Sequence, residues 1–138
     1  MRWHTLRGRE KWLDPRAYLV DWDAKSLSKF QWSVKQFLRR HWERHRIYEE
    51  MPVVGTRMRL DFYNGTLRVA VECDGEQHNG YNRHFHRGSL SVFQSQMKRD
   101  DDKEKWCVLN GITLVRIYPD DVVNLSRAWF KREYDLDI

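Results

Sequence analysis

The chain has 138 residues, with 25 Lys and Arg against 20 Asp and Glu and a formal net charge of +5. This length suits one domain, residues 1–138, whose core seven Trp residues can help to fill. No apolar run reaches membrane-spanning length and no signal-peptide-like stretch opens the chain, so we expect a cytoplasmic protein that does not contact membranes.

The positive excess lies in the first part of the chain. Residues 1–50 hold twelve Lys and Arg and seven Asp and Glu, whereas residues 51–138 hold thirteen of each kind. Residues 1–25 are basic, aromatic and irregular, so we expect an amino-terminal arm or a small packed cap. This asymmetry favours a polyanion as partner over an ordinary solvated surface, because Trp residues alternate here with the cations.

An amphipathic helix is predicted from Ser26, a fair N-cap, to about His45. Its apolar positions recur at helical spacing, and the opposite face is cationic. We expect the polyanion to contact this face and the basic residues that follow it, namely Arg39, Arg40, Arg44, Arg57 and Arg59.

Alternation of apolar and polar residues predicts strands around Met58–Phe62 and from Leu67 to Asp74. Glu72 and Asp74 then share one face of the second of these strands. The intervening Asn64-Gly65 is a strong signal for a tight hairpin.

The register of this hairpin decides whether Asp61 and Glu72 can meet. A two-residue turn at Asn64-Gly65 would place Asp61 opposite Arg68 and leave Glu72 about 13 Å along the strand, too far for one metal ion. For both carboxylates to coordinate one metal ion, Asp61 must lie nearly opposite Glu72. We therefore expect a longer turn centred near Thr66-Leu67, against the local signal.

The rest of the chain alternates helix and strand. A helix is predicted over 91–109 and ends at Asn110-Gly111, a buried strand over 112–117, and a last helix that opens at Pro119 and runs through Phe130. The order helix, three strands, helix, strand, helix predicts an α/β fold, with a mixed central sheet flanked by helices.

Three carboxylates on the predicted strands are the candidate metal ligands. Burying Asp61, Glu72 and Asp74 is costly unless they bind something, and hard oxygen ligands suit Mg²⁺ or Mn²⁺. The structural alternative pairs them with neighbouring arginines, and it would be favoured for an isolated Asp–Glu pair. The third acid and the following Gln77-His78 reverse that preference.

Asp100 is a further candidate, because it lies on the apolar side of its predicted helix and should therefore be paired or functional. Cys73 and Cys107 form no CxxC pair and are expected to be small buried apolar groups. His84 and His86, with His78, are weak support for a zinc or HNH-type site.

The quoted residues resemble the PD-(D/E)XK nuclease superfamily, in the branch of Vsr-type mismatch endonucleases and phage homing endonucleases with an EDxHD signature. The resemblance covers about residues 26–118: Asp61, the run Glu72-Cys73-Asp74-Gly75-Glu76-Gln77-His78, and Arg99-Asp100-x-x-Lys103. It implies a three-layer restriction-endonuclease-like core and a metal-dependent site.

The chain departs from the superfamily pattern at two points. The superfamily Lys, two residues after the Glu, is Asp74 here, so Lys103, Lys98 or His78 would take its role, with His78 favoured. The branch also uses a Glu on the first helix, where Gln31, Gln36 and Glu43 are the nearest residues.

We expect a phage-encoded, Mg²⁺- or Mn²⁺-dependent DNA endonuclease that acts in the host cytoplasm, with a homodimer left open. Its catalytic set is Asp61, Glu72, Asp74, Gln77, His78, Asp100 and Lys103. The alternatives are a Holliday-junction or branched-DNA resolvase on the same fold, and a DNA-binding module that has lost catalysis.

Overall fold

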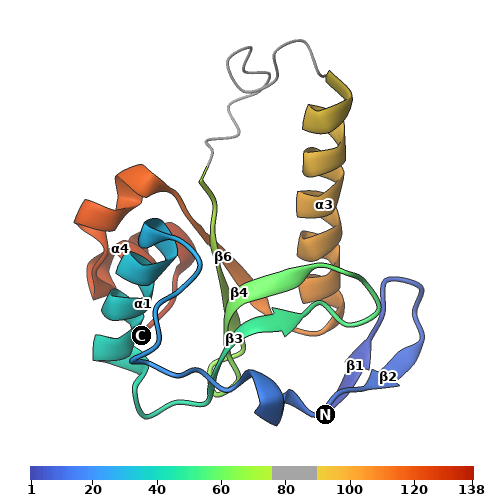
Figure 1. Cartoon of the computed structure of the whole chain (residues 1–138), viewed down its shortest axis with the longest axis horizontal. Helices are drawn as coiled ribbons and strands as arrows, with labels where there is room; N and C mark the ends of the chain where they lie inside the picture. Colours follow the sequence, from blue (N-terminus) through green and yellow to red (C-terminus); the bar gives the residue numbers. More distant parts are fainter. Residues whose placement is uncertain (76–89) are drawn as a thin grey trace.

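The computed structural model describes residues 1–75 and 90–138, and its centre is a four-stranded mixed sheet (Figure 1). Its strands follow the order β3-β4-β5-β6; the first three are antiparallel and β6 runs parallel to β5. The strands are β3 (Ile47–Pro52), β4 (Arg59–Asn64), β5 (Val69–Cys73) and β6 (Thr113–Ile117). The expected α/β class with a mixed sheet is confirmed.

Helices α1 (Lys29–Trp42) and α4 (Arg127–Tyr134) cover one face of this sheet. Phe37 of α1 stacks on Phe130 of α4 with ring centroids 5.9 Å apart, above buried Val71 and Val115 of the sheet. The N-cap of α1 is Ser28 rather than the predicted Ser26, because the Ser28 hydroxyl accepts the N–H of Gln31.

The other face carries α3 (Leu90–Leu109) and a small hairpin of β1 (Arg2–His4) and β2 (Glu10–Trp12). Trp106 of α3 is fully buried against Trp3 of the hairpin. The predicted end of α3 is confirmed, since Gly111 has φ +66° and the N–H of Ile112 donates back to Cys107. In the described ranges, no helix is long and apolar enough to cross a membrane.

Two expectations for the ends of the chain were wrong. Residues 1–25 are not irregular, because they hold the β1–β2 hairpin and a short 3₁₀ helix, η1 (Pro15–Tyr18). The last predicted helix is divided into η2 (Pro119–Asn124) and α4, since the hydroxyl of Ser126 accepts the N–H of Trp129 and starts a new helix.

The register of β4 and β5 confirms the longer turn. Phe62 pairs with Val71 and Asn64 with Val69, and the same register sets Asp61 opposite Glu72. The Asn64 side chain explains why the tight turn does not form, because its Oδ1 accepts the N–H groups of Thr66 and Leu67. The connection is thereby extended over residues 65–68.

Candidate active site

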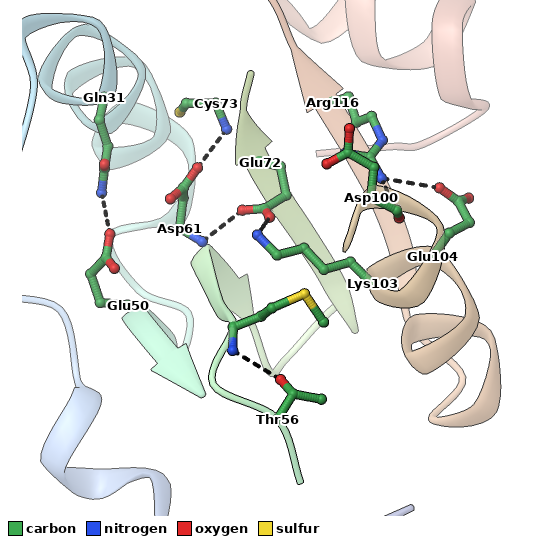
Figure 2. A network of polar contacts seen from close by, with 11 residues as sticks. Gln31, Glu50, Thr56, Asp61, Glu72, Cys73, Asp100, Lys103, Glu104 and Arg116 are labelled. Atoms are coloured by element: carbon green, nitrogen blue, oxygen red, sulfur yellow. Dashed lines mark hydrogen bonds and ion pairs between the residues drawn. The ribbon is translucent and has the colours of Figure 1, made fainter. Parts of the chain in front are cut away.

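Four ionisable residues, one on each strand, lie next to one another in a row across the sheet. Glu72 of β5 lies between Asp61 of β4 and Arg116 of β6, with which it is in register. Glu50 of β3 lies at the level of Asp61, because the flanking Glu49 and Met51 pair with Phe62 and Leu60. Figure 2 shows Asp61, Glu72 and the side chains that surround them.

The Asp61 and Glu72 side chains bind the backbone of each other's strand. The N–H of Asp61 donates to Oε2 of Glu72 at 2.9 Å, and the N–H of Cys73 donates to Oδ2 of Asp61 at 2.7 Å. Glu72 is buried, with 4% of its surface exposed. These bonds hold two carboxylates in fixed positions on adjacent strands, as the register hypothesis required.

Lys103 of α3 reaches across to this pair. Its ammonium group donates to Oε1 of Glu72 in a largely buried ion pair. Lys98, the other helix lysine considered, instead pairs with Asp102 at 3.0 Å, and 75% of its side chain is exposed. Of these two lysines the structure thus brings only Lys103 to the carboxylates.

Several predicted residues lie outside the described ranges. Gln77 and His78, and also His84 and His86, fall between residue 75 and residue 90. The catalytic role favoured for His78 therefore stays a prediction.

Burial makes ionisation of the Asp61 carboxyl unfavourable. Desolvation and the charge of Glu72 raise the pKa of Asp61 from its ordinary 3.8 to about 8, while Lys103 partly opposes this rise. A positive charge placed between the carboxylates would remove the repulsion that raises this pKa.

A pH dependence of stability follows for the metal-free protein. The folded chain keeps a proton on Asp61 that the unfolded chain releases near its ordinary pKa of 3.8, so the unfolded state binds fewer protons from about pH 4 to about pH 8. The free energy of unfolding should therefore fall as pH rises through this window. Urea unfolding in EDTA at pH 5 and pH 8 measures the fall, and Asp61→Asn should show a smaller one. An equal fall in both proteins would contradict the raised pKa of Asp61 as the cause of this pH dependence.

Asp74 and Asp100 lie on the β6 side of the pair. Asp74 follows the end of β5, where its N–H donates to the carbonyl of Ile117 at 2.8 Å. Asp100 forms an ion pair with Arg116 at 3.8 Å, which agrees with the expectation that it is paired or functional. Burial and then the charge of Asp74 raise the pKa of Tyr118, to which Asp100 also contributes. Coordination by Asp74 stays a prediction.

The sequence did not reveal Glu50, nor that Gln31 of the first helix contacts it. Glu50 has φ +56°, a left-handed conformation that costs a non-glycine residue about 1–3 kcal/mol. Gln31 of α1 is buried and donates to Glu50 at 3.2 Å and to Glu49 at 3.1 Å. The first helix thus supplies an amide that holds an acid of β3, at a position where an acid of its own had been sought.

Neither cysteine is poised as a nucleophile. Burial raises the pKa of Cys107 to about 12. Burial and the charges of Asp61 and Glu72 raise the pKa of the Cys73 thiol as well. Both thiols are therefore protonated near neutral pH, as expected for small apolar groups.

The donor atoms at Asp61 and Glu72 fit a hard divalent cation. In residues 1–75 and 90–138, no three His, Cys, Asp or Glu side chains converge closely enough to hold an ion by themselves. Mg²⁺ needs no such cage, since one or two carboxylates, several waters and a substrate phosphate commonly complete its shell. The carboxylates of Asp61, which has a raised proton affinity, and of buried Glu72 are suitable for that mode of binding.

The predicted DNA-binding arginines fall into two groups. Arg57 and Arg59 are exposed; Arg59 begins β4, the strand of Asp61, and Arg57 comes two residues before it. Arg40 is exposed in the last turn of α1, and Arg44 is exposed just beyond its end. Arg40 lies about 14 Å along the helix axis from Gln31. Arg39 is paired with Asp23 at 2.9 Å. Arg57 and Arg59 are therefore the closer group to the carboxylates.

Comparison with known proteins finds viral relatives. The chain is 33% identical over 66 residues to "Uncharacterized protein 033L" of Invertebrate iridescent virus 3, across 48% of this chain and 34% of that protein. It is 35% identical over 66 residues to "Uncharacterized protein 094L" of Frog virus 3, across 48% of this chain and 43% of that protein. "Uncharacterized protein 307L" of Invertebrate iridescent virus 6 is 33% identical over 60 residues, across 44% and 30%.

The matched stretch thus spans between 30% and 43% of the length of these relatives. No protein-family profile matches the chain, and no solved structure matches it.

Proposed function

We propose that this chain is a virus-encoded, metal-dependent DNA endonuclease on a restriction-endonuclease-like fold. The observation that carries the proposal is the pairing of half-buried Asp61 with buried Glu72, two carboxylates held on neighbouring strands by each other's backbone. Lys103 compensates the charge of Glu72, so Asp61 must either stay protonated or be compensated by a further cation. The viral origin rests on the three iridescent-virus and frog-virus relatives.

Asp61 and Glu72 would hold Mg²⁺ or Mn²⁺, and the ion would supply an acidified water and neutralise charge on the phosphate. Lys103 lies beside Glu72 and can place a positive charge next to the phosphate. The Gln31–Glu50 contact fixes a further carboxylate on the adjacent strand. His78 would serve as acid or base near neutral pH.

DNA is the proposed partner because the basic residues flank the carboxylates. Arg57 and Arg59 are exposed on the segment that leads into Asp61, and exposed arginines neutralise phosphates without reading sequence. A phosphate held there would lie near the residues proposed to cleave it.

The proposal is tested by incubating the protein with labelled linear duplex and four-way-junction DNA in Mg²⁺ or Mn²⁺. We expect cleavage of at least one substrate in metal. Preference for the junction would indicate a resolvase. If the folded protein binds one or both DNAs and cleaves neither, a DNA-binding module that has lost catalysis would be favoured.

A further inference from the structure

We propose that the β1–β2 hairpin is a platform for an unpaired DNA strand next to the cleavage site, with a base stacked on Trp12. This inference rests on the proposed function and names the kind of substrate: DNA with a single-stranded segment.

Trp12 differs from the other tryptophans in exposure. Its side chain is 71% exposed, whereas the remaining Trp residues are buried or half-buried. In the hairpin register Trp12 lies opposite Arg2, on the outer face that also carries His4 and Glu10. Arg2 also lies 3.9 Å from Glu10. An exposed indole beside an arginine is a surface on which a nucleic-acid base can stack.

The hairpin that presents Trp12 is firmly attached to the domain. Trp3 on its inner face stacks on Trp106 with ring centroids 5.4 Å apart. The side chain of Asn110 accepts the N–H of His4 at 2.8 Å and donates to the His4 carbonyl at 3.0 Å. Trp12 is thus held exposed by an ordered support, which lowers the entropic cost of stacking a base on it.

A basic groove adjoins the hairpin. Its volume is about 620 Å³, and it lies between the hairpin loop and the turn at Gly55. Gly55 is required there, because a Cβ at that position would meet the Thr5 side chain at 2.8 Å. Three cations and one acid are among its lining residues: Arg7, Arg9, Lys11 and Glu10. This charge suits a phosphate backbone.

The segment that leads into β4 connects the groove to the proposed active site. Thr56 lines it, and Asp61 follows five residues later, so the two lie within about 17 Å of each other. The exposed Arg57 and Arg59 lie between them in sequence. A single strand suits this path better than a duplex, because an unpaired base has a free face for the Trp12 ring.

The test is the affinity for a fluorescent oligo-dT and for a duplex of the same length, measured in EDTA. Trp12→Ala should weaken oligo-dT binding about 5- to 100-fold, and Trp12→Phe should retain most of the affinity because it keeps a ring. Removing Arg9 and Lys11 together should lower the salt slope by about 0.7 per lost phosphate contact. Val123→Ala is the control, since Val123 is 88% exposed on η2 and should leave affinity unchanged.

Unchanged oligo-dT affinity in Trp12→Ala would overturn the inference. So would a loss of self-association in that variant with DNA binding intact, which would assign Trp12 to a second copy of the chain. Cleavage by the wild-type protein tests the proposed function separately from the binding of oligo-dT. If wild type cleaves no DNA in Mg²⁺ yet binds oligo-dT through Trp12, the single-strand binding site is supported and the nuclease activity is rejected. If wild type cleaves and Trp12→Ala binds oligo-dT normally, only the platform is wrong.

Discussion

Asp61→Asn is expected to abolish measurable DNA cleavage while leaving the fold and DNA affinity largely intact. It removes one of the two carboxylates proposed to hold the metal, and with it several kcal/mol of transition-state stabilisation, a loss of about 1,000-fold or more. The amide keeps the shape of the side chain and can still accept the N–H of Cys73. DNA binding without metal can even tighten, because a negative charge that faces phosphate is lost.

Single-turnover cleavage in Mg²⁺ and Mn²⁺ measures this loss. Asp23→Asn is a matched control, since Asp23 is 84% exposed and pairs with Arg39 away from the sheet. Glu72→Gln should resemble Asp61→Asn, and Asp74→Asn reports whether a third carboxylate takes part. Cleavage by Asp61→Asn at the wild-type rate would show that the site is assigned to the wrong residues.

Replacing Lys103 is expected to reduce both stability and cleavage. Lys103→Met keeps the aliphatic stem but leaves Glu72 as an unpaired charge that is almost fully buried. Breaking a buried pair in this way costs about 3–5 kcal/mol of unfolding free energy. Cleavage should fall about 100- to 10,000-fold if the ammonium group assists the reaction.

Urea unfolding and cleavage of folded protein separate the two effects. Lys98→Met is the matched control, because the Lys98–Asp102 pair is exposed and its loss should change stability by less than about 0.5 kcal/mol. Adding Glu72→Gln to Lys103→Met should restore much of the stability but none of the cleavage. If Lys103→Met cleaves normally while His78→Ala does not, His78 rather than Lys103 replaces the superfamily Lys.

The sequence was sufficient to predict the position of the carboxylate pair. The alternation around Asp61 and Glu72 predicted two half-buried strands, and their eleven-residue separation fixed the register once both were required to meet. The Asn64-Gly65 dipeptide alone favoured the other register. The requirement for shared coordination predicted the turn correctly, because Asn64 uses its side chain to close a longer connection.

Other features depend on tertiary contacts that periodicity does not reveal. The predicted order included a strand before β4, but the bounds of β3 were not predicted, because Glu49 and Glu50 interrupt its apolar pattern. Their partners Lys35 and Gln31 come from a helix earlier in the chain. The amino-terminal hairpin is stable because Trp3 packs on Trp106, which lies about a hundred residues away.

Plasmid cleavage by the wild-type protein, with Mg²⁺ or with EDTA, tests most directly whether the Asp61–Glu72 pair belongs to a metal-dependent nuclease. We expect supercoiled DNA to be nicked or linearised in Mg²⁺, to stay intact in EDTA, and to be cleaved again when Mg²⁺ is restored in excess. Folded protein that leaves the plasmid intact in both Mg²⁺ and Mn²⁺, or that cleaves it equally well in EDTA, would contradict this account.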